Sequence, residues 1–241
     1  MVRIFSVKIP KACTVNVQEV MNLLSEERRQ RTLRFRRKED RIRSVLAEAL
    51  IRTLLIREHR LDNRSLRFAV NRYGKPYLAD LPDCQFNLSH AGDYVLCAID
   101  QKPLGIDVEE IKPIDLSIAS RFFTPGENQE IQRMPEDRRL DHFYQLWTAK
   151  ESYIKFKGTG LSMPLNSFSL HISAERIELV EQDGSPVAQV ECYFKSFHLS
   201  ANYKVTLCSE SPHYPKEIQN IDCQELLREF RERSGESYAT H

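Results

Sequence analysis

The segment Leu104–Glu110 carries two carboxylates whose spacing suits a divalent cation. Its hydrophobic residues alternate with Asp107 and Glu109, which is the period-two pattern of a β-strand. Alternate side chains of a strand share a face, so these carboxylates point the same way, about 7 Å apart along the backbone. Carboxylates this close repel each other unless solvent or a cation lies between them. Magnesium prefers such oxygen ligands together with phosphate oxygens. The alternative is a solvated strand end that needs no metal.

A second polar pair, Ser89 and His90, is predicted at the tip of a hairpin formed by strands at 86–90 and 94–99. The pair does not suit a nucleophile and its base, because adjacent strand residues point to opposite faces and no third partner is apparent. We expect Ser89 and His90 to donate hydrogen bonds to an anion. The alternative is a pair of turn residues without a function.

A third group lies on a helix expected at 138–157. Trp147, Glu151 and Lys155 are spaced i, i+4 and i+8, so they form one row on that helix. A surface ion pair between Glu151 and Lys155 is the alternative explanation of this spacing.

Charge is distributed unevenly along the chain, although the formal net charge is only +1. Nine basic side chains stand against two acidic ones between Arg28 and Arg43, and acidic residues gather between Asp107 and Glu151. A basic first half and an acidic second half suit a polyanionic ligand together with a cation. Two solvated helical faces of unlike charge are the alternative.

The surrounding pattern predicts an α/β protein of the α+β type that brings these groups together. Long amphipathic helices are expected at 39–60 and 138–157, each followed by strands, and the strand beginning at Tyr94 is similar to the one beginning at Tyr203. We expect two similar α/β halves in a pseudo-two-fold arrangement, each a small sheet packed with a long helix, and a site in the cleft between them. The expected division is 1–103 and 104–230, with a frayed tail at 231–241.

Shorter elements follow from local signals. Capping residues predict helix starts at Ser25 and at Thr124-Pro125, and Gly158 predicts a helix end. Turns are expected at Tyr73-Gly-Lys-Pro76 and at Asp183-Gly184. The remaining strands are expected at 2–9, 65–70, 167–172, 176–180, 188–194 and 204–208, and the remaining helices at 116–123 and 222–230.

The composition is that of an ordinary globular protein. The chain has 241 residues, of which 41% are hydrophobic and 29% charged, and it can bury a sizeable core. No apolar run reaches membrane-spanning length, and the first ten residues lack the features of a signal peptide. The six cysteines are scattered without metal-ligand spacing. We expect reduced thiols in a cytoplasmic protein that binds neither membrane nor nucleic acid.

Three motifs resemble, in order and spacing, those of the 4′-phosphopantetheinyl transferases. They are Asn87-Leu-Ser-His90, Gly105-Ile-Asp-Val-Glu109 and Trp147-Thr-Ala-Lys-Glu-Ser-Tyr-Ile-Lys155. The chain is most similar to the broad-specificity, surfactin-synthetase-activating type, and the similarity reaches from the arginine-rich region to about Phe230. The resemblance implies a monomer that moves phosphopantetheine from coenzyme A to a serine hydroxyl of an apo peptidyl or acyl carrier protein, as in nonribosomal peptide and antibiotic synthesis. It also implies dependence on magnesium, or manganese, and release of adenosine 3′,5′-bisphosphate.

The resemblance also implies roles for individual residues. Asp107, Glu109 and Glu151 take the positions of the metal ligands, and Glu151 or Glu127 is the candidate base. Lys150 and Lys155 take positions that meet the pyrophosphate. The other positions implied to bind coenzyme A are Arg28, Arg31, Arg36, Ser44, Lys75, Pro76, Ser89 and His90.

Residues 111–123 form the expected docking surface for the carrier protein, with apolar side chains such as Leu116 flanked by Lys112 and Arg121. Burial of these apolar side chains in the core is the alternative. Two rival functions also remain open. A metal-dependent nuclease could use Asp107 with Glu110-Ile-Lys112, although the near-balanced charge is unlike that of a nucleic-acid binder. A non-catalytic carrier-binding or nucleotide-binding module is the second rival.

Overall fold

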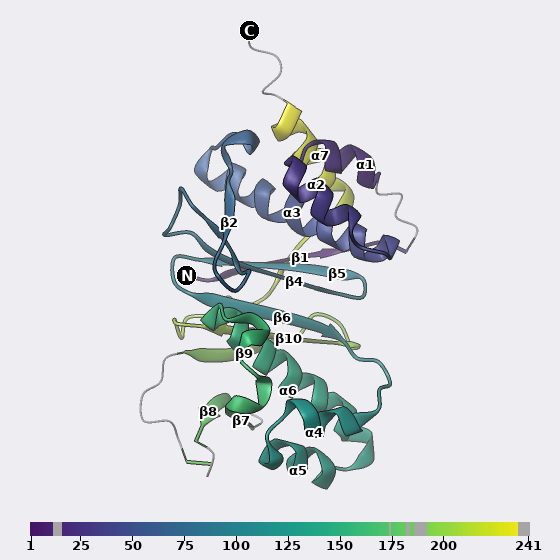
Figure 1. The fold of residues 1–241 in the computed structure, drawn as a ribbon, viewed down its shortest axis with the longest axis vertical. Coiled ribbons are helices and arrows are strands. Elements are labelled where there is room, and N and C mark those ends of the chain that lie inside the picture. The colour runs from purple at the N-terminus through teal and green to yellow at the C-terminus, as the bar shows by residue number, and fades with distance from the viewer. Residues whose placement is uncertain (12–15, 174, 182–183, 186–191, 236–241) are drawn as a thin grey trace.

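The computed structural model describes the chain except residues 12–15, 174, 182–183, 186–191 and 236–241. Its layers run helix, sheet, sheet, helix (Figure 1). The first sheet has the strand order β11-β1-β5-β4 and the second has the order β6-β10-β9. One core fills the space between the two sheets, and one further core lies between each sheet and its helices.

The N-terminal half combines the first sheet with four helices. Its sheet strands are β1 (Arg3–Lys8), β4 (Gln85–Ala91), β5 (Tyr94–Asp100) and β11 (Gln219–Ile221). Its helices are α1 (Val17–Asn22), α2 (Glu26–Leu33), α3 (Lys38–His59) and α7 (Cys223–Gly235). A short helix η1 (Asn63–Ser65) and the hairpin of β2 (Phe68–Val70) and β3 (Pro76–Leu78) complete this half.

The middle of α3 is buried on every side, from Ser44 to Ile56. The expected amphipathic pattern therefore does not hold over this stretch. The reason is that α3 packs against β5 as well as against α1, α2 and α7. Even Arg52 is buried, and it pairs with Glu48 at 2.7 Å.

The C-terminal half packs one long helix against the second sheet. The strands of that sheet are β6 (Leu104–Glu110), β9 (Tyr193–Phe197) and β10 (Tyr203–Ser209), and the long helix is α6 (Glu136–Lys157). Around them lie η2 (Leu116–Ile118), α4 (Ala119–Phe122), α5 (Pro125–Arg133), η3 (Gly160–Ser162), η4 (Leu165–Ser167), β7 (Ser169–Ile172) and β8 (Ile177–Val180). Thr124 and Glu127 form a capping box at the start of α5, and Gly158 ends α6 with φ of 68°, as predicted.

The two halves share one topology, which confirms the expected internal similarity. In each half the first strand is followed by the long helix and then by two strands, and the last of these lies between the other two. The order β1-β5-β4 therefore corresponds to β6-β10-β9, with α3 corresponding to α6. The two segments of similar sequence, at Tyr94 and Tyr203, are the equivalent strands β5 and β10.

The end of the chain departs from the expected division. β11 pairs in parallel with β1, and α7 packs its Leu226, Leu227 and Phe230 into the core of the N-terminal half. Residues 219–230 therefore belong to the first half and not to the second. The first five residues of the expected frayed tail continue α7 to Gly235, and the rest of that tail lies outside the described residues.

Other differences are local. β2 begins three residues later than expected, and β9 lies at Tyr193–Phe197 where a strand was expected at 188–194. Asp183 of the expected turn lies outside the described residues, as do residues 188–191. None of the five described cysteines forms a disulfide, and no helix in the described part of the chain is long and apolar enough to cross a membrane.

The two halves meet where β4 lies beside β6. Side chains of β4, and not its backbone, form hydrogen bonds with the backbone of β6 there. Oδ1 of Asn87 accepts a hydrogen bond from the N–H of Ile106 at 2.8 Å, and Oγ of Ser89 accepts one from the N–H of Val108 at 3.2 Å. On the other side of β6, a Cβ at Gly105 would overlap the backbone of α6 at Ser152 and Phe156. The missing side chain at Gly105 therefore lets α6 approach β6 closely.

Candidate active site

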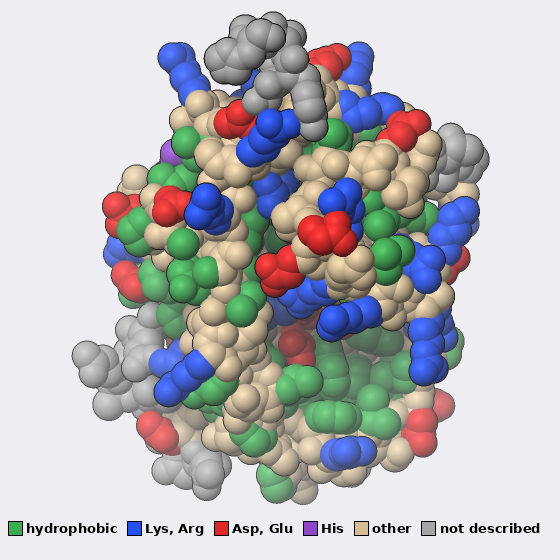
Figure 2. Space-filling model, turned by 45° about the horizontal axis from the view of Figure 1, so that its top comes forward, with side chains coloured by type: hydrophobic (Ala, Val, Ile, Leu, Met, Phe, Trp, Pro, Cys, Tyr) green, Lys and Arg blue, Asp and Glu red, His purple; other side chains and the backbone are tan. Residues whose placement is uncertain are grey.

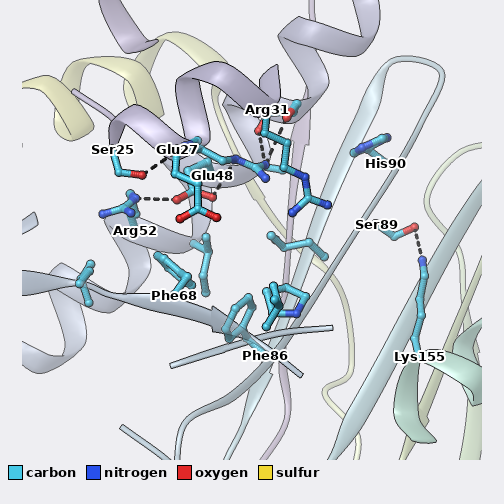
Figure 3. A pocket seen from close by; sticks show the side chains of 18 of the residues that line it. Ser25, Glu27, Arg31, Glu48, Arg52, Phe68, Phe86, Ser89, His90 and Lys155 are labelled. Carbon is cyan, nitrogen blue, oxygen red and sulfur yellow. Dashed lines mark hydrogen bonds and ion pairs between the residues drawn. The ribbon is translucent and has the colours of Figure 1, made fainter. Parts of the chain in front are cut away.

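A cavity of about 800 Å³ opens between the two halves. Figure 2 shows a hollow in one face of the molecule, with acidic and basic side chains meeting in it. The N-terminal half contributes residues of α2, α3, β2, β3 and β4, and the C-terminal half contributes residues of β6 and α6. Figure 3 shows Lys155 of α6 reaching toward Ser89 of β4 across this boundary.

Three carboxylates lie together on the C-terminal side of the cavity. Asp107 and Glu109 come from β6 and Glu151 comes from α6. Burial and the charge of Asp107 raise the pKa of Glu109 to about 7, and the same two causes raise the pKa of Glu151. The predicted shared face of Asp107 and Glu109 is confirmed, because Ile106 and Val108 alternate with them and are buried between the sheets.

Asp107 is the most buried of the three carboxylates. Its Oδ1 accepts hydrogen bonds from Oγ of Ser89 at 2.9 Å and from Nζ of Lys155 at 2.6 Å. Its Oδ2 is buried without a hydrogen-bond partner among the described residues. A buried carboxylate oxygen without a partner is costly, and a hard cation is the kind of group that satisfies it.

The donor set therefore fits a magnesium ion, although the side chains do not form a compact cluster. Among the described residues, no group of three His, Cys, Asp or Glu side chains is close enough to hold a metal by itself. Magnesium sites commonly take one or two carboxylates and complete their coordination with water and phosphate oxygens. The open arrangement of Asp107, Glu109 and Glu151 is consistent with that pattern.

The predicted row on α6 is confirmed, since Trp147, Glu151 and Lys155 all line the cavity. The Trp147 side chain lies beside Glu109, where it opposes the rise of the Glu109 pKa, and its ring packs edge-on against Phe122 at 5.3 Å. Lys155 binds Asp107 and also donates to Oγ of Ser89 at 3.0 Å. These contacts tie α6, β6 and β4 into one unit around the carboxylates.

The opposite wall of the cavity is basic. Nη2 of Arg28 donates to Oγ of Ser44 at 3.2 Å, and its Nε lies 3.3 Å from Glu48. Arg31 lines the cavity and has no ion-pair partner among the described residues. The arginines that line this wall are Arg28, Arg31, Arg52, Arg64 and Arg67.

Several cavity residues were missed by the sequence analysis. Glu48 and Arg52 form a row with Ser44 at i, i+4 and i+8 along α3, and the Arg52 guanidinium lies 4.9 Å from the centre of the Phe68 ring. The sequence feature that could have identified Glu48 and Arg52 is the presence of charged residues within an otherwise apolar helix. The cavity also has an apolar wall that consists of Ile51, Leu66, Phe68, Phe86 and Leu88. Local sequence patterns could not predict this wall, because its residues come from several elements.

Among the residues expected to bind coenzyme A, Arg28, Arg31, Ser44, Pro76, Ser89, His90 and Lys155 line the cavity. Arg36 and Lys75 are not among its described lining residues. Arg36 is exposed in the loop between α2 and α3. Lys75 donates to the carbonyl of Leu104 at 3.0 Å, and burial lowers its pKa to about 8. Lys75 therefore links the β2–β3 turn to the start of β6.

Lys150 and Glu127 are not among the described residues that line the cavity. Lys150 was expected to contact the pyrophosphate, and Glu127 was one of the two candidate bases. Lys150 is fully buried, and its Nζ lies 2.8 Å from Oε1 of Glu127. Lys150 points into the interior of the C-terminal half because α6 turns successive residues to different sides, and it meets Glu127 of α5 there. Of the two candidate bases, only Glu151 faces the cavity.

The expected docking segment is partly exposed. Lys112 and Arg121 are exposed, Leu116 is half-buried and Phe123 is buried, so the core alternative holds for Phe123. Phe122 connects this segment to Trp147 of the cavity. The nuclease spacing gains no support, because Lys112 makes a surface ion pair with Glu110 at 2.6 Å.

Comparisons with known proteins agree with this geometry. Residues 103–208 match the model described as "4′-phosphopantetheinyl transferase superfamily", and residues 11–102 match "4′-phosphopantetheinyl transferase, N-terminal". The chain is 40% identical to "4′-phosphopantetheinyl transferase Sfp" of Bacillus subtilis (strain 168), over 87% of this chain and 92% of that one. It is 36% identical to "4′-phosphopantetheinyl transferase gsp" of Aneurinibacillus migulanus, over 95% of each chain.

The chain belongs to the 4′-phosphopantetheinyl transferase superfamily. Proteins of this superfamily transfer phosphopantetheine to carrier proteins and use coenzyme A as a substrate. This transferase has both acidic and basic side chains in the lining of one cavity. The nuclease and the non-catalytic binding module, which the sequence left open, are set aside.

Proposed function

We propose that this transferase moves the 4′-phosphopantetheine group from coenzyme A to a serine hydroxyl of an apo carrier protein, with magnesium, and releases adenosine 3′,5′-bisphosphate. The observation that carries the proposal is the meeting of Asp107, Glu109, Glu151 and Lys155 with an arginine-lined wall in one cavity. Its volume of about 800 Å³ falls within the range of small-molecule sites. The arginine-lined wall suits the phosphates of coenzyme A, and the carboxylate side suits a cation.

The arginine-lined wall is proposed to bind the nucleotide end of coenzyme A. Arg31 is free to pair with a phosphate, and Arg28 is already oriented by Ser44 and Glu48. Arginine presents a planar fork of donors that matches phosphate oxygens. His90 lines the same cavity from β4 and adds a further donor for the 3′-phosphate. The apolar wall at Phe68 and Phe86 offers surface for the flat adenine ring.

The carboxylate side is proposed to hold magnesium, with manganese as a substitute, through Asp107, Glu109 and Glu151. The bound ion would neutralise charge on the pyrophosphate and stabilise the leaving group. Lys155 supplies a fixed positive charge beside Asp107. Ser89 holds the oxygen Oδ1 of Asp107 in place and leaves Oδ2 available to a ligand.

In the reaction, the serine oxygen forms a bond to the phosphorus atom that carries pantetheine. The bond from that phosphorus to the bridging oxygen breaks, and the bridging oxygen leaves with adenosine 3′,5′-bisphosphate. We assign acceptance of the serine proton to Glu151, because it lines the cavity whereas Glu127 is buried in an ion pair.

The carrier protein is proposed to dock on the surface of residues 111–123, beside Trp147. Ile118 is 37% exposed there, and Lys112 and Arg121 supply positive charge for an acidic partner. We propose that the partners are peptidyl or acyl carrier domains of nonribosomal peptide or antibiotic synthesis. The enzyme is proposed to act as a cytoplasmic monomer, without nucleic acid or membrane.

Intact mass measurement of an apo carrier protein incubated with enzyme, coenzyme A and magnesium tests this function. A mass increase of one phosphopantetheine group is expected, together with adenosine 3′,5′-bisphosphate in equal amount. Chelation of the metal should stop the reaction, and added magnesium should restore it. No mass increase on several peptidyl and acyl carrier proteins would contradict the proposal.

A further inference from the structure

The Lys150–Glu127 ion pair is completely enclosed in the C-terminal half. Lys150 has no exposed surface, and Glu127 is 4% exposed. Nζ of Lys150 donates to Oε1 of Glu127 at 2.8 Å and to the carbonyl oxygens of Leu165 and Phe168 at 2.8 and 2.6 Å. All three ammonium hydrogens therefore have an acceptor.

Glu127 is equally well satisfied. Its Oε1 also accepts from the N–H of Leu170 at 2.8 Å, and its Oε2 accepts from the N–H of Thr124 at 2.8 Å. The pair thus fastens α6 to the start of α5 and to the segment that leads into β7. Neither residue is among the described residues that line the cavity.

Stability alone is a weak reason for such a pair. Removing two charges from water is expensive, and well-packed apolar side chains of similar size often give equal or greater stability. Burial lowers the pKa of Lys150, which reflects the cost of removing the ammonium charge from water. The charge of Glu127 raises this pKa and offsets part of that effect. A buried pair with every hydrogen bond made does, however, fix one arrangement of the elements that it joins.

The element that it fixes carries one side of the active site. Lys150 directly precedes Glu151, and α6 also presents Trp147 and Lys155 to the cavity. Successive helix residues are turned by about 100° around the axis. A rotation or a shift of α6 would move Glu151. Because Lys150 is anchored on the interior side, such a movement would also have to break the contacts of Lys150 with Glu127, Leu165 and Phe168. We propose that the Lys150–Glu127 pair is a positioning device that sets the rotation of α6 and so holds Glu151 at the reacting centre.

This inference rests on the proposed function, and replacing the whole pair separates positioning from simple stability. Lys150→Met or Glu127→Leu alone leaves one charge buried, so each single variant should melt at a lower temperature. The double variant Lys150→Met/Glu127→Leu leaves no charge buried and should regain part of the lost melting temperature, although the backbone groups that the pair satisfied lose their partners. Its kcat should nevertheless fall about tenfold or more, as for groups that orient metal ligands, with KM for coenzyme A changed less than about twofold.

Magnesium affinity is the second measurement, and it does not depend on turnover. Trp147 is the sole tryptophan of the chain and contacts Glu109, so its fluorescence can follow magnesium titration. We expect about tenfold weaker magnesium binding in the double variant. Leu226→Ala, which opens a cavity in the core of the other half, is the control for stability loss and should keep wild-type kcat and magnesium affinity.

A double variant with wild-type kcat and wild-type magnesium affinity would overturn the inference and leave the pair a structural feature only. If the double variant does not fold, Glu127→Gln decides, because glutamine keeps the size and an acceptor for Lys150. That variant should lose several-fold in kcat and in magnesium affinity, and unchanged values for both would equally overturn the inference. Absence of transfer by the wild-type enzyme would instead contradict the proposed function.

Discussion

The side chain of Asn87 and the backbone of Ile106 form a hydrogen bond of 2.8 Å that joins the edge strands of the two halves. Replacing Asn87 with alanine leaves the buried N–H of Ile106 unpaired, which should lower the free energy of unfolding by about 1–3 kcal/mol. Transfer should also weaken, because the cavity spans this junction. Chemical denaturation measures the first effect and carrier modification the second.

Gln85→Ala is the control for the Asn87 variant. Gln85 lies on the same strand but donates only to the nearby carbonyl of Pro82. Its loss should change stability by less than about 0.5 kcal/mol, as at an ordinary surface position. Equal effects of the two variants would contradict the bridging role of Asn87.

Gly105 and Gly126 offer a matched pair of glycine substitutions. A Cβ at Gly105 would overlap the backbone of α6 at Ser152 and Phe156, whereas a Cβ at Gly126 would have no neighbour within 4 Å. Gly105→Ala should therefore push α6 away from β6, cost about 1–3 kcal/mol or more, and sharply lower transfer. Gly126→Ala should leave melting temperature and activity near wild type. A fully active Gly105→Ala enzyme would show that the close approach is dispensable.

Local patterns predicted much of this fold because their causes are local. The alternation around Asp107, the helix start at Thr124-Pro125 and the end of α6 at Gly158 each depend on a few neighbouring residues. The return of α7 to the first half could not be predicted in this way, because it depends on contacts with α3 across more than half of the chain.

The candidate site shows the same limit. Trp147, Glu151 and Lys155 were found because one helical row presents them together. Lys150 was assigned to the pyrophosphate by resemblance, but α6 turns it to the interior, where it donates to the carbonyl oxygens of Leu165 and Phe168 and pairs with Glu127.

Magnesium binding should depend on pH because the pKa of Glu109 is raised to about 7. Below this pKa the carboxyl group is protonated, and magnesium has to displace the proton. Apparent magnesium affinity should therefore rise as the pH increases from about 6 to 8, measured by Trp147 fluorescence. Glu109→Gln should bind magnesium weakly and lose most of this pH dependence. An affinity that stays constant over this range in the wild type would rule out Glu109 as a ligand that titrates there.

Arg31 is expected to recognise the 3′-phosphate of coenzyme A in the ground state and in the transition state alike. Arg31→Ala should raise KM for coenzyme A about tenfold and leave kcat nearly unchanged. Dephospho-coenzyme A should be a poor substrate for the wild type, yet lose little more with Arg31→Ala. Steady-state kinetics with both donors measures this coupling. If the variant still discriminated against dephospho-coenzyme A as strongly as the wild type does, Arg31 would not contact that phosphate.

Transfer by Asp107→Ala is the most direct test of the central claim that the carboxylate side of this cavity is the catalytic centre. The variant should keep its circular dichroism spectrum, although its melting temperature should fall because Ser89 and Lys155 lose their acceptor Oδ1. With magnesium and saturating coenzyme A, intact mass measurement should show complete modification of the carrier by the wild type and none by Asp107→Ala in the same time. Modification by folded Asp107→Ala at the wild-type rate would contradict the claim.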